Sequence, residues 1–303
     1  EAAANSAQVV VFPETYLPAF PVWCSLQAPI YNHEFFRALA ANAALVDGPE
    51  LAAVAEAARQ NEIFVSLGFN EGSAISAGCI WNANVVIDDR GAILCHHRKI
   101  MPTFYEKLVW AAGDGAGLHV SDTRLGKLGM LICGENTNPL ARYTMLAQGE
   151  QVHLSTYPPI WPTHDPDTSG GYDLERAILL RAGAHSFEGK VFNIVASGFL
   201  DRATKERLAA CGPDAERILE RSPRGISVVI GPDGNPLSEI RADEEGLLYA
   251  EIDLALGVEP KQIHDIVGGY NRFDIFELKV NRSANRPISF DPPLPPGEAS
   301  DGA

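Results

Sequence analysis

The chain contains 303 residues, of which 46% are hydrophobic and 21% are charged, as in an ordinary globular protein. Its 24 basic and 39 acidic residues give a net charge of −15, which disfavours nucleic acids and anionic membrane surfaces as partners. The sequence contains neither a run of 18 apolar residues nor a basic-then-apolar leader, so it predicts no membrane span and no signal peptide.

The first half of the chain alternates between strand and helix patterns. Apolar residues at a period of two predict strands, those at a period near 3.6 predict helices, and Gly, Pro and Asp mark the turns between them. The patterns predict a strand at 9–12, helices at 33–46 and 49–61, a strand at 63–69, a hairpin of 79–87 with 92–97, and a short helix at 105–110.

The second half continues this alternation. It predicts strands at 128–133, 152–156, 191–199, 226–230 and 247–252, and helices at 139–149 and 172–187. Beyond Arg286 the chain is rich in Pro and Gly, which predicts a disordered tail. Interleaved strands and helices without a break in composition indicate an α/β layered fold in one domain, residues 1–284, followed by the tail at 285–303.

Cysteine usage bears on the compartment. An odd number of cysteines without a CxxC pair disfavours a disulfide framework and a zinc knuckle. The sequence therefore predicts a reducing, cytoplasmic environment for the five cysteines, Cys24, Cys79, Cys95, Cys133 and Cys211.

The strongest local motif is LICGENTNP at residues 131–139, where a buried strand leads into a turn and then a helix. Cys133 lies at the end of that strand, where free backbone N–H groups and the positive helix end favour the thiolate. An unassisted thiol with a pKa of about 8.5 is only slightly ionised at neutral pH, so other groups must activate it. The motif predicts a nucleophile, and taken alone it is equally consistent with a buried structural cysteine.

Two charged residues follow other predicted strands. Lys99 lies where a strand turns, so its amine could point into a cleft, or it could be a solvated lysine that discourages edge pairing. Glu14 follows the strand at 9–12, and taken alone it is an ordinary surface carboxylate. The adjacent His96 and His97 lack a ligand partner three or four residues away, which argues against a metal site there.

Together these three segments resemble the carbon–nitrogen hydrolase (nitrilase) superfamily, whose Glu–Lys–Cys triad comes from strand ends in this chain order. FPET at 12–15 carries Glu14, HRKIMPT at 97–103 carries Lys99, and CGEN at 133–136 carries Cys133. The triad positions are 85 and then 34 residues apart, which fits the family. Glu106 corresponds to the family's second glutamate, which supports the lysine and the substrate.

The resemblance covers residues 1 to about 282 and is closer to nitrilases proper than to the amidase branches. It rests on the stretches at 14–23, 109–114 and 142–153, on Ile-Met-Pro-Thr after Lys99, and on GGYNRFD at 268–274. It implies a four-layer α-β-β-α sandwich that forms homodimers or longer spirals. Two departures stand out: Gly134 replaces a bulky Trp found in many nitrilases, and the family's opening strand is absent before Glu1.

The resemblance also implies a mechanism. Cys133 attacks the nitrile carbon, Glu14 takes and returns the thiol proton, and burial must raise the pKa of Glu14 toward neutrality for that task. Lys99 and the backbone N–H of Gly134 meet the negative charge that develops on the nitrile nitrogen. The thioimidate and thioester intermediates need no cofactor and no metal, and the products are a carboxylic acid and ammonia.

Substrate identity is not determined by these motifs. Tyr157, Trp161 and Trp23 are aromatic candidates for the substrate pocket, and core or interface packing explains them equally well. Aliphatic, aromatic and arylaceto nitriles and cyanide all remain open. Two other functions are compatible with the same motifs: an amidase of the same superfamily, and a non-catalytic scaffold that retains the fold.

Overall fold

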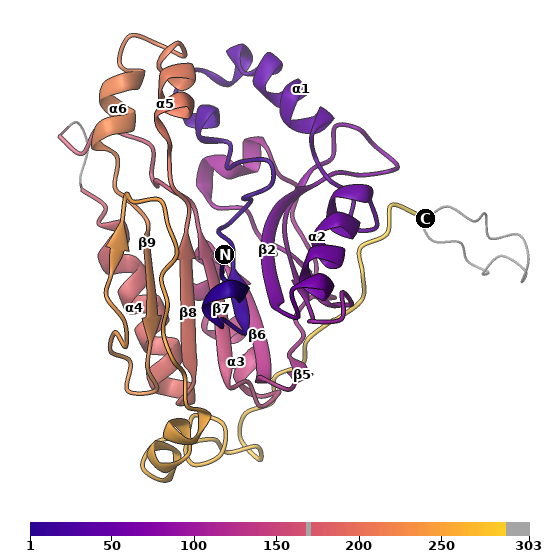
Figure 1. The fold of residues 1–303 in the computed structure, drawn as a ribbon, viewed down its shortest axis with the longest axis vertical. Coiled ribbons are helices and arrows are strands. Elements are labelled where there is room, and N and C mark those ends of the chain that lie inside the picture. The colour runs from indigo at the N-terminus through magenta and orange to yellow at the C-terminus, as the bar shows by residue number, and fades with distance from the viewer. Residues whose placement is uncertain (168–170, 289–303) are drawn as a thin grey trace, which may run out of the picture.

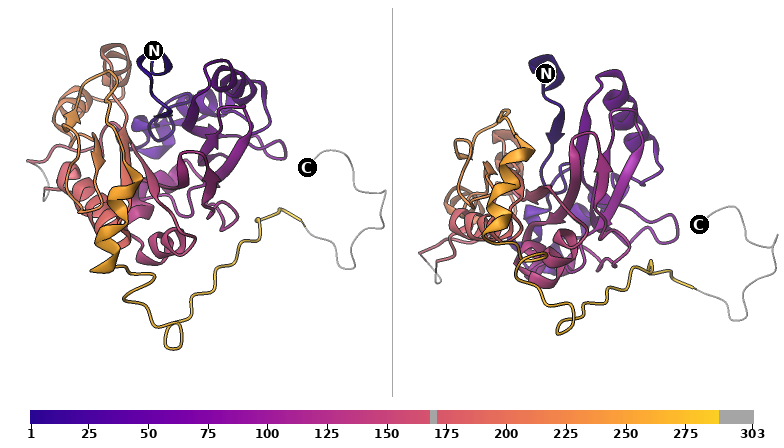
Figure 2. Two further views of the ribbon diagram at one scale, coloured as in Figure 1. Left: turned by 60° about the horizontal axis from the view of Figure 1, so that its bottom comes forward. Right: turned by 90° about the horizontal axis from the view of Figure 1, so that it is seen from below.

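A computed structural model describes residues 1–167 and 171–288. It contains two β-sheets, one built from the first third of the chain and the other from the rest (Figure 1). Most of the tail predicted to be disordered lies outside the described residues. Residues 277–288 have no regular structure (Figure 2), and Arg282 and Asn285 contact the body at Ala116 and Asp114.

The first sheet has the strand order β1-β2-β3-β4. β1 pairs in parallel with β2, and the remaining pairs are antiparallel. Every residue of β2 is buried, which explains its nearly continuous run of apolar and small side chains. The strands are β1 (Val9–Val11), β2 (Phe64–Glu71), β3 (Trp81–Ile87) and β4 (Ile93–Arg98).

The second sheet has the order β10-β9-β8-β7-β6-β5. Its centre is the parallel trio β6, β7 and β8, so the carboxyl ends of these three strands share one edge. Functional side chains in α/β sheets gather at such an edge. The strands are β5 (Ser121–Thr123), β6 (Gly126–Ile132), β7 (Val152–Tyr157), β8 (Phe192–Ser197), β9 (Ile226–Ile230) and β10 (Arg241–Ala242).

Separate apolar clusters identify the layers. Phe64 and Val86 from the first sheet meet Met130 and Leu154 from the second, so the two sheets pack face to face. The outer face of the first sheet is covered by α2 (Pro49–Gln60), and that of the second by α3 (Pro139–Leu146) and α4 (Leu174–Gly189). The predicted four-layer α-β-β-α sandwich is therefore confirmed (Figures 1 and 2).

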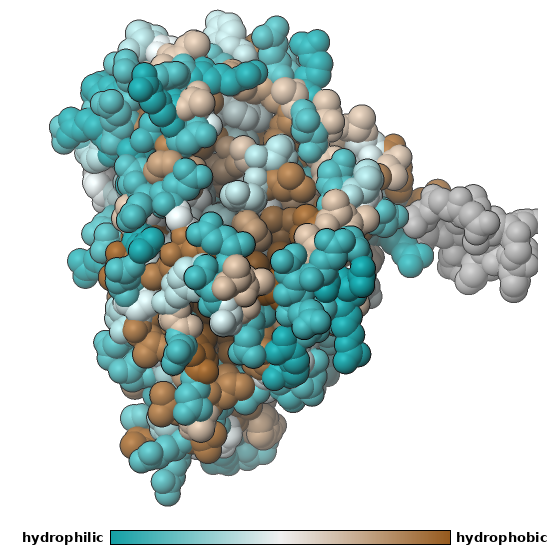
Figure 3. Space-filling view, viewed as in Figure 1, coloured by the Kyte–Doolittle hydropathy of each residue, from teal (hydrophilic) through white to brown (hydrophobic). Residues whose placement is uncertain are grey.

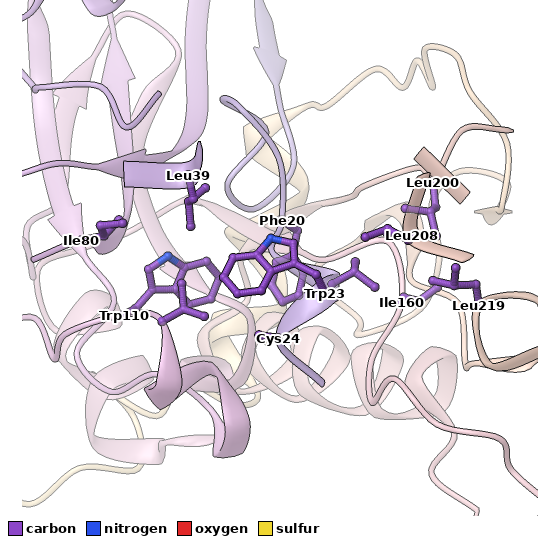
Figure 4. Packing of buried hydrophobic residues seen from close by; sticks show 12 residues of the cluster. Phe20, Trp23, Cys24, Leu39, Ile80, Trp110, Ile160, Leu200, Leu208 and Leu219 are labelled. Carbon is purple, nitrogen blue, oxygen red and sulfur yellow. The ribbon is translucent and has the colours of Figure 1, made fainter. Parts of the chain in front are cut away.

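A further cluster closes one end of the sandwich. Figure 4 shows Trp23 and Trp110 in this cluster, with Leu39 from α1 (His33–Ala41) and Leu208 and Leu219 from α5 (Arg202–Ala209) and α6 (Ala215–Arg221). Aromatic side chains contribute much of the buried area in such a cap. The short 3-10 segments are Ala3–Asn5, Val22–Ser25, Pro29–Tyr31, Phe104–Leu108, Cys133–Thr137, Leu254–Gly257 and Glu259–Gln262.

Some predicted elements are wrong. Residues 247–252 form no strand, and the short β10 pairs with β9 in their place. The helix predicted at 33–46 ends at Ala41, because Ala44 bridges to Glu71 in the first sheet. The short helix predicted at 105–110 is present as the 3-10 helix Phe104–Leu108, whereas β5, α5 and α6 were not predicted.

Candidate active site

Three strand ends converge at one place in the molecule. Glu14 follows β1, Lys99 follows β4, and Cys133 follows β6, and the distance between the Lys99 Nζ and the Glu14 Oε1 is 2.8 Å. Oxygens of Glu14 and Glu106 and the Sγ of Cys133 all lie within 4.8 Å of one another. The four side chains belong to residues that are only 0–4% exposed. Residues far apart in sequence thus share one buried site.

Glu14 has a hydrogen-bonding environment that leaves one oxygen available. Its Oε1 accepts bonds from Lys99 and from the Asn82 Nδ2 at 2.6 Å, whereas its buried Oε2 has no partner. Burial raises the pKa of Glu14 to about 7, against the opposing effect of the Lys99 ammonium. This agrees with the shift that the sequence-based mechanism required, and it leaves the carboxyl able to gain or lose a proton near neutral pH.

Lys99 lies between two buried carboxyl groups. Its Nζ donates to the Glu106 Oε2 at 2.6 Å as well as to Glu14. Burial by itself would lower the pKa of Lys99, but the charges of Glu106 and Glu14 outweigh it and raise that pKa well above the ordinary value. The amine is therefore held as a cation, ready to meet negative charge in the pocket.

The second glutamate is fixed by its own turn. Thr103 begins the 3-10 segment Phe104–Leu108, and its backbone N–H donates to the Glu106 Oε2 at 2.7 Å. A Cβ placed on Gly134 would lie 2.7 Å from the Thr103 Oγ1. The Thr103 hydroxyl thus occupies the space that the side chain of a larger residue at position 134 would need. This contact is a local reason for glycine at that position.

Cys133 has a strained backbone. Its φ is +50°, and Thr15 and Phe104, which also adjoin the site, have φ values of +45° and +49°. Such conformations cost energy in residues other than glycine and cluster at functional sites. Three strained residues around one pocket are a signal that only the structure reveals.

The position of Cys133 was expected to favour the thiolate, and in the structure other effects outweigh that tendency. Burial, reinforced by the carboxylate of Glu14, raises the pKa of the Cys133 thiol well above its ordinary value, and the charge of Lys99 only partly opposes this. The predicted order of strand, turn and helix is confirmed, with the 3-10 turn Cys133–Thr137 followed by α3 at Pro139. The resting nucleophile is a thiol, so its proton must leave during attack, and Glu14 lies beside it.

The turn after Cys133 is held by two residues to which the sequence analysis gave no role. Glu135 accepts backbone bonds from Ile132 at 2.8 Å and Ile100 at 2.5 Å, and it pairs with His97 at 2.9 Å. The Asn136 Nδ2 donates to the carbonyl of Cys133 at 3.1 Å. The sequence feature that could have indicated this role is Glu135, a charged residue in a turn that directly follows a buried strand.

The aromatic pocket candidates divide between two clusters. Tyr157 is fully buried at the end of β7 and packs in the same cluster as Cys133. Trp161 packs against that cluster and makes an edge-to-face contact with Tyr172. The Tyr157 hydroxyl and the Trp161 indole nitrogen are buried without partners. Trp23 belongs to the cap instead, stacked on Phe35.

Among the residues that the structure describes, two groups of side chains bring potential metal ligands together. In the first, Glu14, Glu106 and Cys133, the ammonium of Lys99 binds both carboxyl groups and supplies the positive charge there. In the second, Glu150, His153 and His185, nitrogen and oxygen atoms 2.6 Å apart form hydrogen bonds between the potential ligands. A proton occupies each of these two contacts, so these atoms do not direct free lone pairs at a common cation.

Comparison with known families and proteins agrees with this geometry. The family model described as carbon-nitrogen hydrolase matches residues 1–262. A nitrilase of Paraburkholderia phymatum is 32% identical over 95% of this chain and 81% of its own length. An arylacetonitrilase of Aspergillus kawachii is 32% identical over 95% and 86%, and an aliphatic nitrilase of Rhodococcus rhodochrous is 31% identical over 95% and 77%.

Solved structures support the fold. The NitFhit protein of C. elegans superposes with a TM-score of 0.68 at 19% identity, covering 94% of this chain and 62% of that one. A carbon-nitrogen hydrolase of Helicobacter pylori G27 has a TM-score of 0.62 at 22% identity, covering 86% and 82%. With three strand-end motifs, a sandwich fold and a family match over most of its length, this chain belongs to the carbon-nitrogen hydrolase family, in its nitrilase branch.

Proposed function

We propose that this protein is a nitrilase that hydrolyses an organic nitrile to its carboxylic acid and ammonia, with Cys133 as nucleophile. The observation that carries the proposal is the convergence of Glu14, Lys99 and Cys133 in one buried pocket. Similar proteins support the proposal as well, because relatives that are about 31–32% identical over most of this chain are named as nitrilases.

The first chemical step needs a base, because the resting Cys133 is a thiol. The unpartnered Oε2 of Glu14 is the acceptor available for the thiol proton as sulfur attacks the nitrile carbon. A carboxyl with a pKa of about 7 is well matched to accept that proton and to return it later.

The nitrile nitrogen gains negative charge during attack. Lys99 contributes a buried ammonium, and the backbone N–H of Gly134 contributes a second donor beside the sulfur. Protonation of this nitrogen gives a thioimidate. Addition of one water and loss of ammonia leaves a thioester, and a second water releases the acid and regenerates the Cys133 thiol. Glu106 keeps Lys99 in place through both steps.

For the substrate pocket we propose Tyr157 and Trp161, whose polar atoms are buried without partners close to the nucleophile. Aromatic walls with a few unpaired polar groups are typical of small-molecule sites. We propose an organic nitrile as the small-molecule substrate and residues 1–284 as one catalytic domain.

We also propose a homo-oligomer that functions in the cytoplasm. In support, the C-terminal segment exposes several large apolar side chains in a short length of chain, Ile263, Tyr270, Phe273, Ile275 and Phe276. Apolar side chains also interrupt the hydrophilic surface in the view of Figure 3. In residues 1–167 and 171–288, no helix is long and apolar enough to cross a bilayer.

The experiment is an ammonia-release assay on aliphatic, aromatic and arylaceto nitriles, with acid and amide measured separately. We expect turnover by the wild type and its loss in Cys133→Ala. Cys79→Ala removes a half-buried thiol elsewhere in the first sheet region and serves as the matched control, which should keep its activity. Undiminished ammonia release by Cys133→Ala, or turnover of amides but not of matched nitriles, would refute the proposal.

A further inference from the structure

A second buried group of charged residues lies behind the nucleophile. Glu150, His153 and His185 are each no more than 1% exposed. The Glu150 Oε1 is 2.6 Å from the His153 Nδ1, and its Oε2 is 2.6 Å from the His185 Nε2. The mechanism above assigns no role to this group, although burying it costs energy that its internal bonds must offset.

The group is connected to Cys133 through one side chain. The His153 Nε2 is 2.9 Å from the Asn136 Oδ1. On its other side, Asn136 donates from its Nδ2 to the carbonyl of Cys133 at 3.1 Å and to that of Leu131 at 3.2 Å. The connection therefore runs from Glu150 through His153 and Asn136 to the backbone of the nucleophile.

The hydrogen bonds determine where the protons are. Because the Asn136 amide nitrogen faces two carbonyl oxygens, its Oδ1 must face His153, and an amide oxygen only accepts. The His153 Nε2 must therefore carry a proton. The two oxygens of Glu150 face the His153 Nδ1 and the His185 Nε2 at 2.6 Å each, as in a carboxylate that accepts two hydrogen bonds, so the His153 Nδ1 carries a proton as well. The two histidines outweigh the effect of burial and lower the pKa of Glu150 to about 2.

His185 completes the charge balance. Burial and the neighbouring His153 lower the pKa of His185 to about 4, so this ring is neutral. Its Nε2–H donates to Glu150, and its Nδ1 is buried without a partner, as a neutral ring with its proton on Nε2 requires. Glu150 and His153 then carry one negative and one positive charge, which compensate each other inside the protein.

The fold makes room for this group. A Cβ on Gly129, the residue of β6 beside His153 in the sheet, would collide with the Glu150 Oε1. The Ser155 Oγ adds a longer bond of 3.3 Å to the same Asn136 oxygen. The space left by Gly129 and the hydrogen bonds from His153 and Ser155 therefore fix the orientation of the Asn136 amide group.

We propose that Glu150, His153 and Asn136 are positioning residues, and that His153 is a buried imidazolium that orients Asn136 so that it fixes the peptide between Cys133 and Gly134. This inference rests on the proposed function, because the N–H of that same peptide is the donor assigned to the developing charge. A hydrogen bond to the carbonyl of a peptide polarises its N–H and strengthens the bonds that this N–H makes, by about 10–30% per bond. It also holds Cys133 at its strained φ of +50°.

Asn136→Ala tests the link to the nucleophile through two reactions. Nitrile hydrolysis needs the Gly134 N–H, so we expect kcat to fall by about 10²-fold with KM nearly unchanged. Alkylation of Cys133 by iodoacetamide places no charge at that N–H, so its rate should stay within about threefold of wild type. Ser155→Ala removes only the longer bond to Asn136 and is the matched control, with a change in kcat of less than about threefold.

A fall in alkylation parallel to the fall in kcat would show that Asn136 merely keeps the turn folded, and would overturn the positioning role. An unchanged kcat would overturn it as well. If the wild type hydrolyses no nitrile, the proposed function fails, and the state of His153 is still decided separately by the following measurement.

The charge of His153 is measured by NMR of ¹⁵N-histidine-labelled protein, since the chain has only eight histidines and a His153→Gln spectrum identifies the signal. We expect both ring nitrogens of His153 to be protonated at pH 7, and those of His185 to show one protonated and one bare nitrogen. In Glu150→Gln, His153 should lose its second proton. A neutral His153 in the wild type would overturn the assignment.

Discussion

Two groups of buried charged side chains lie on either side of the turn that begins at Cys133, and they differ in how fully their polar atoms are paired. In the pocket of Glu14, Lys99 and Glu106, one oxygen of each carboxyl group is buried without a partner. In the group of Glu150 and His153, both carboxylate oxygens and both nitrogens of His153 are hydrogen-bonded.

The pKa values follow the same division. Burial raises the pKa of Glu14 to about 7, whereas two histidines keep that of Glu150 at about 2. A carboxyl with spare hydrogen-bonding capacity and a pKa near neutrality can exchange a proton with a substrate, while a saturated, permanently charged one holds its neighbours in place. Burial alone therefore does not distinguish a reactive group from a supporting one. At Glu14, an unpartnered carboxyl oxygen occurs together with a pKa near neutrality.

The largest combined effect on stability and activity is expected from Lys99→Met. Removing the cation leaves Glu14 and Glu106 facing each other in a buried site, which costs about 3–5 kcal/mol of folding free energy. Loss of the donor to the nitrile nitrogen should also lower kcat by about 10³-fold. Urea unfolding and ammonia release measure the two effects. Lys107→Met, which alters an exposed lysine in the same turn, should change neither, and a stable, active Lys99→Met would contradict the role given to the cation.

Glu14→Gln tests the base. Because the carboxyl must be ionised to accept the thiol proton, kcat/KM of the wild type should rise with pH and reach half its maximum near the pKa of about 7. The amide cannot accept that proton, so kcat should fall by about 10²–10⁴-fold and the rising limb of the pH profile should disappear. A variant that keeps this limb would show that another group titrates.

Glu150→Gln should affect stability more than chemistry, by about 1–3 kcal/mol at pH 7. The pKa of Glu150 is depressed in the folded state, so its contribution is present above the unfolded value near 4.3 and is lost as pH falls from there toward 2. Urea unfolding at pH 7 and pH 4 should therefore show a smaller acid-induced loss in the variant.

Glu56→Gln provides a matched control for this experiment. Hydrogen bonds from Arg59 and Gln60 lower the pKa of Glu56 to about 2 as well, but this carboxylate is exposed on α2. Water and salt screen an exposed pair, so its loss should leave stability unchanged. Equal effects of the two substitutions would mean that burial gives Glu150 no special role.

The errors in the predicted fold have identifiable causes. Residues 247–252 are largely apolar, as in a strand, but composition does not reveal whether a sheet edge is available, and β10 lies beside β9 instead. The helix α5 is almost entirely polar, with only Leu208 buried, so it lacks an apolar stripe. Its one local signal was Asp201, whose side chain caps the helix at Thr204.

The sequence by itself determined the layered α/β class, the positions of the main strands along the chain, and the three motif residues Glu14, Lys99 and Cys133. It could do so because local periodicity and short motifs are encoded in neighbouring residues. Only the tertiary structure decided their convergence, the rise of the Glu14 pKa, and the connection from Glu150 to the Cys133 carbonyl. These depend on burial and on contacts between distant segments, and the cost of burying a charge is set by its surroundings rather than by its neighbours in the chain.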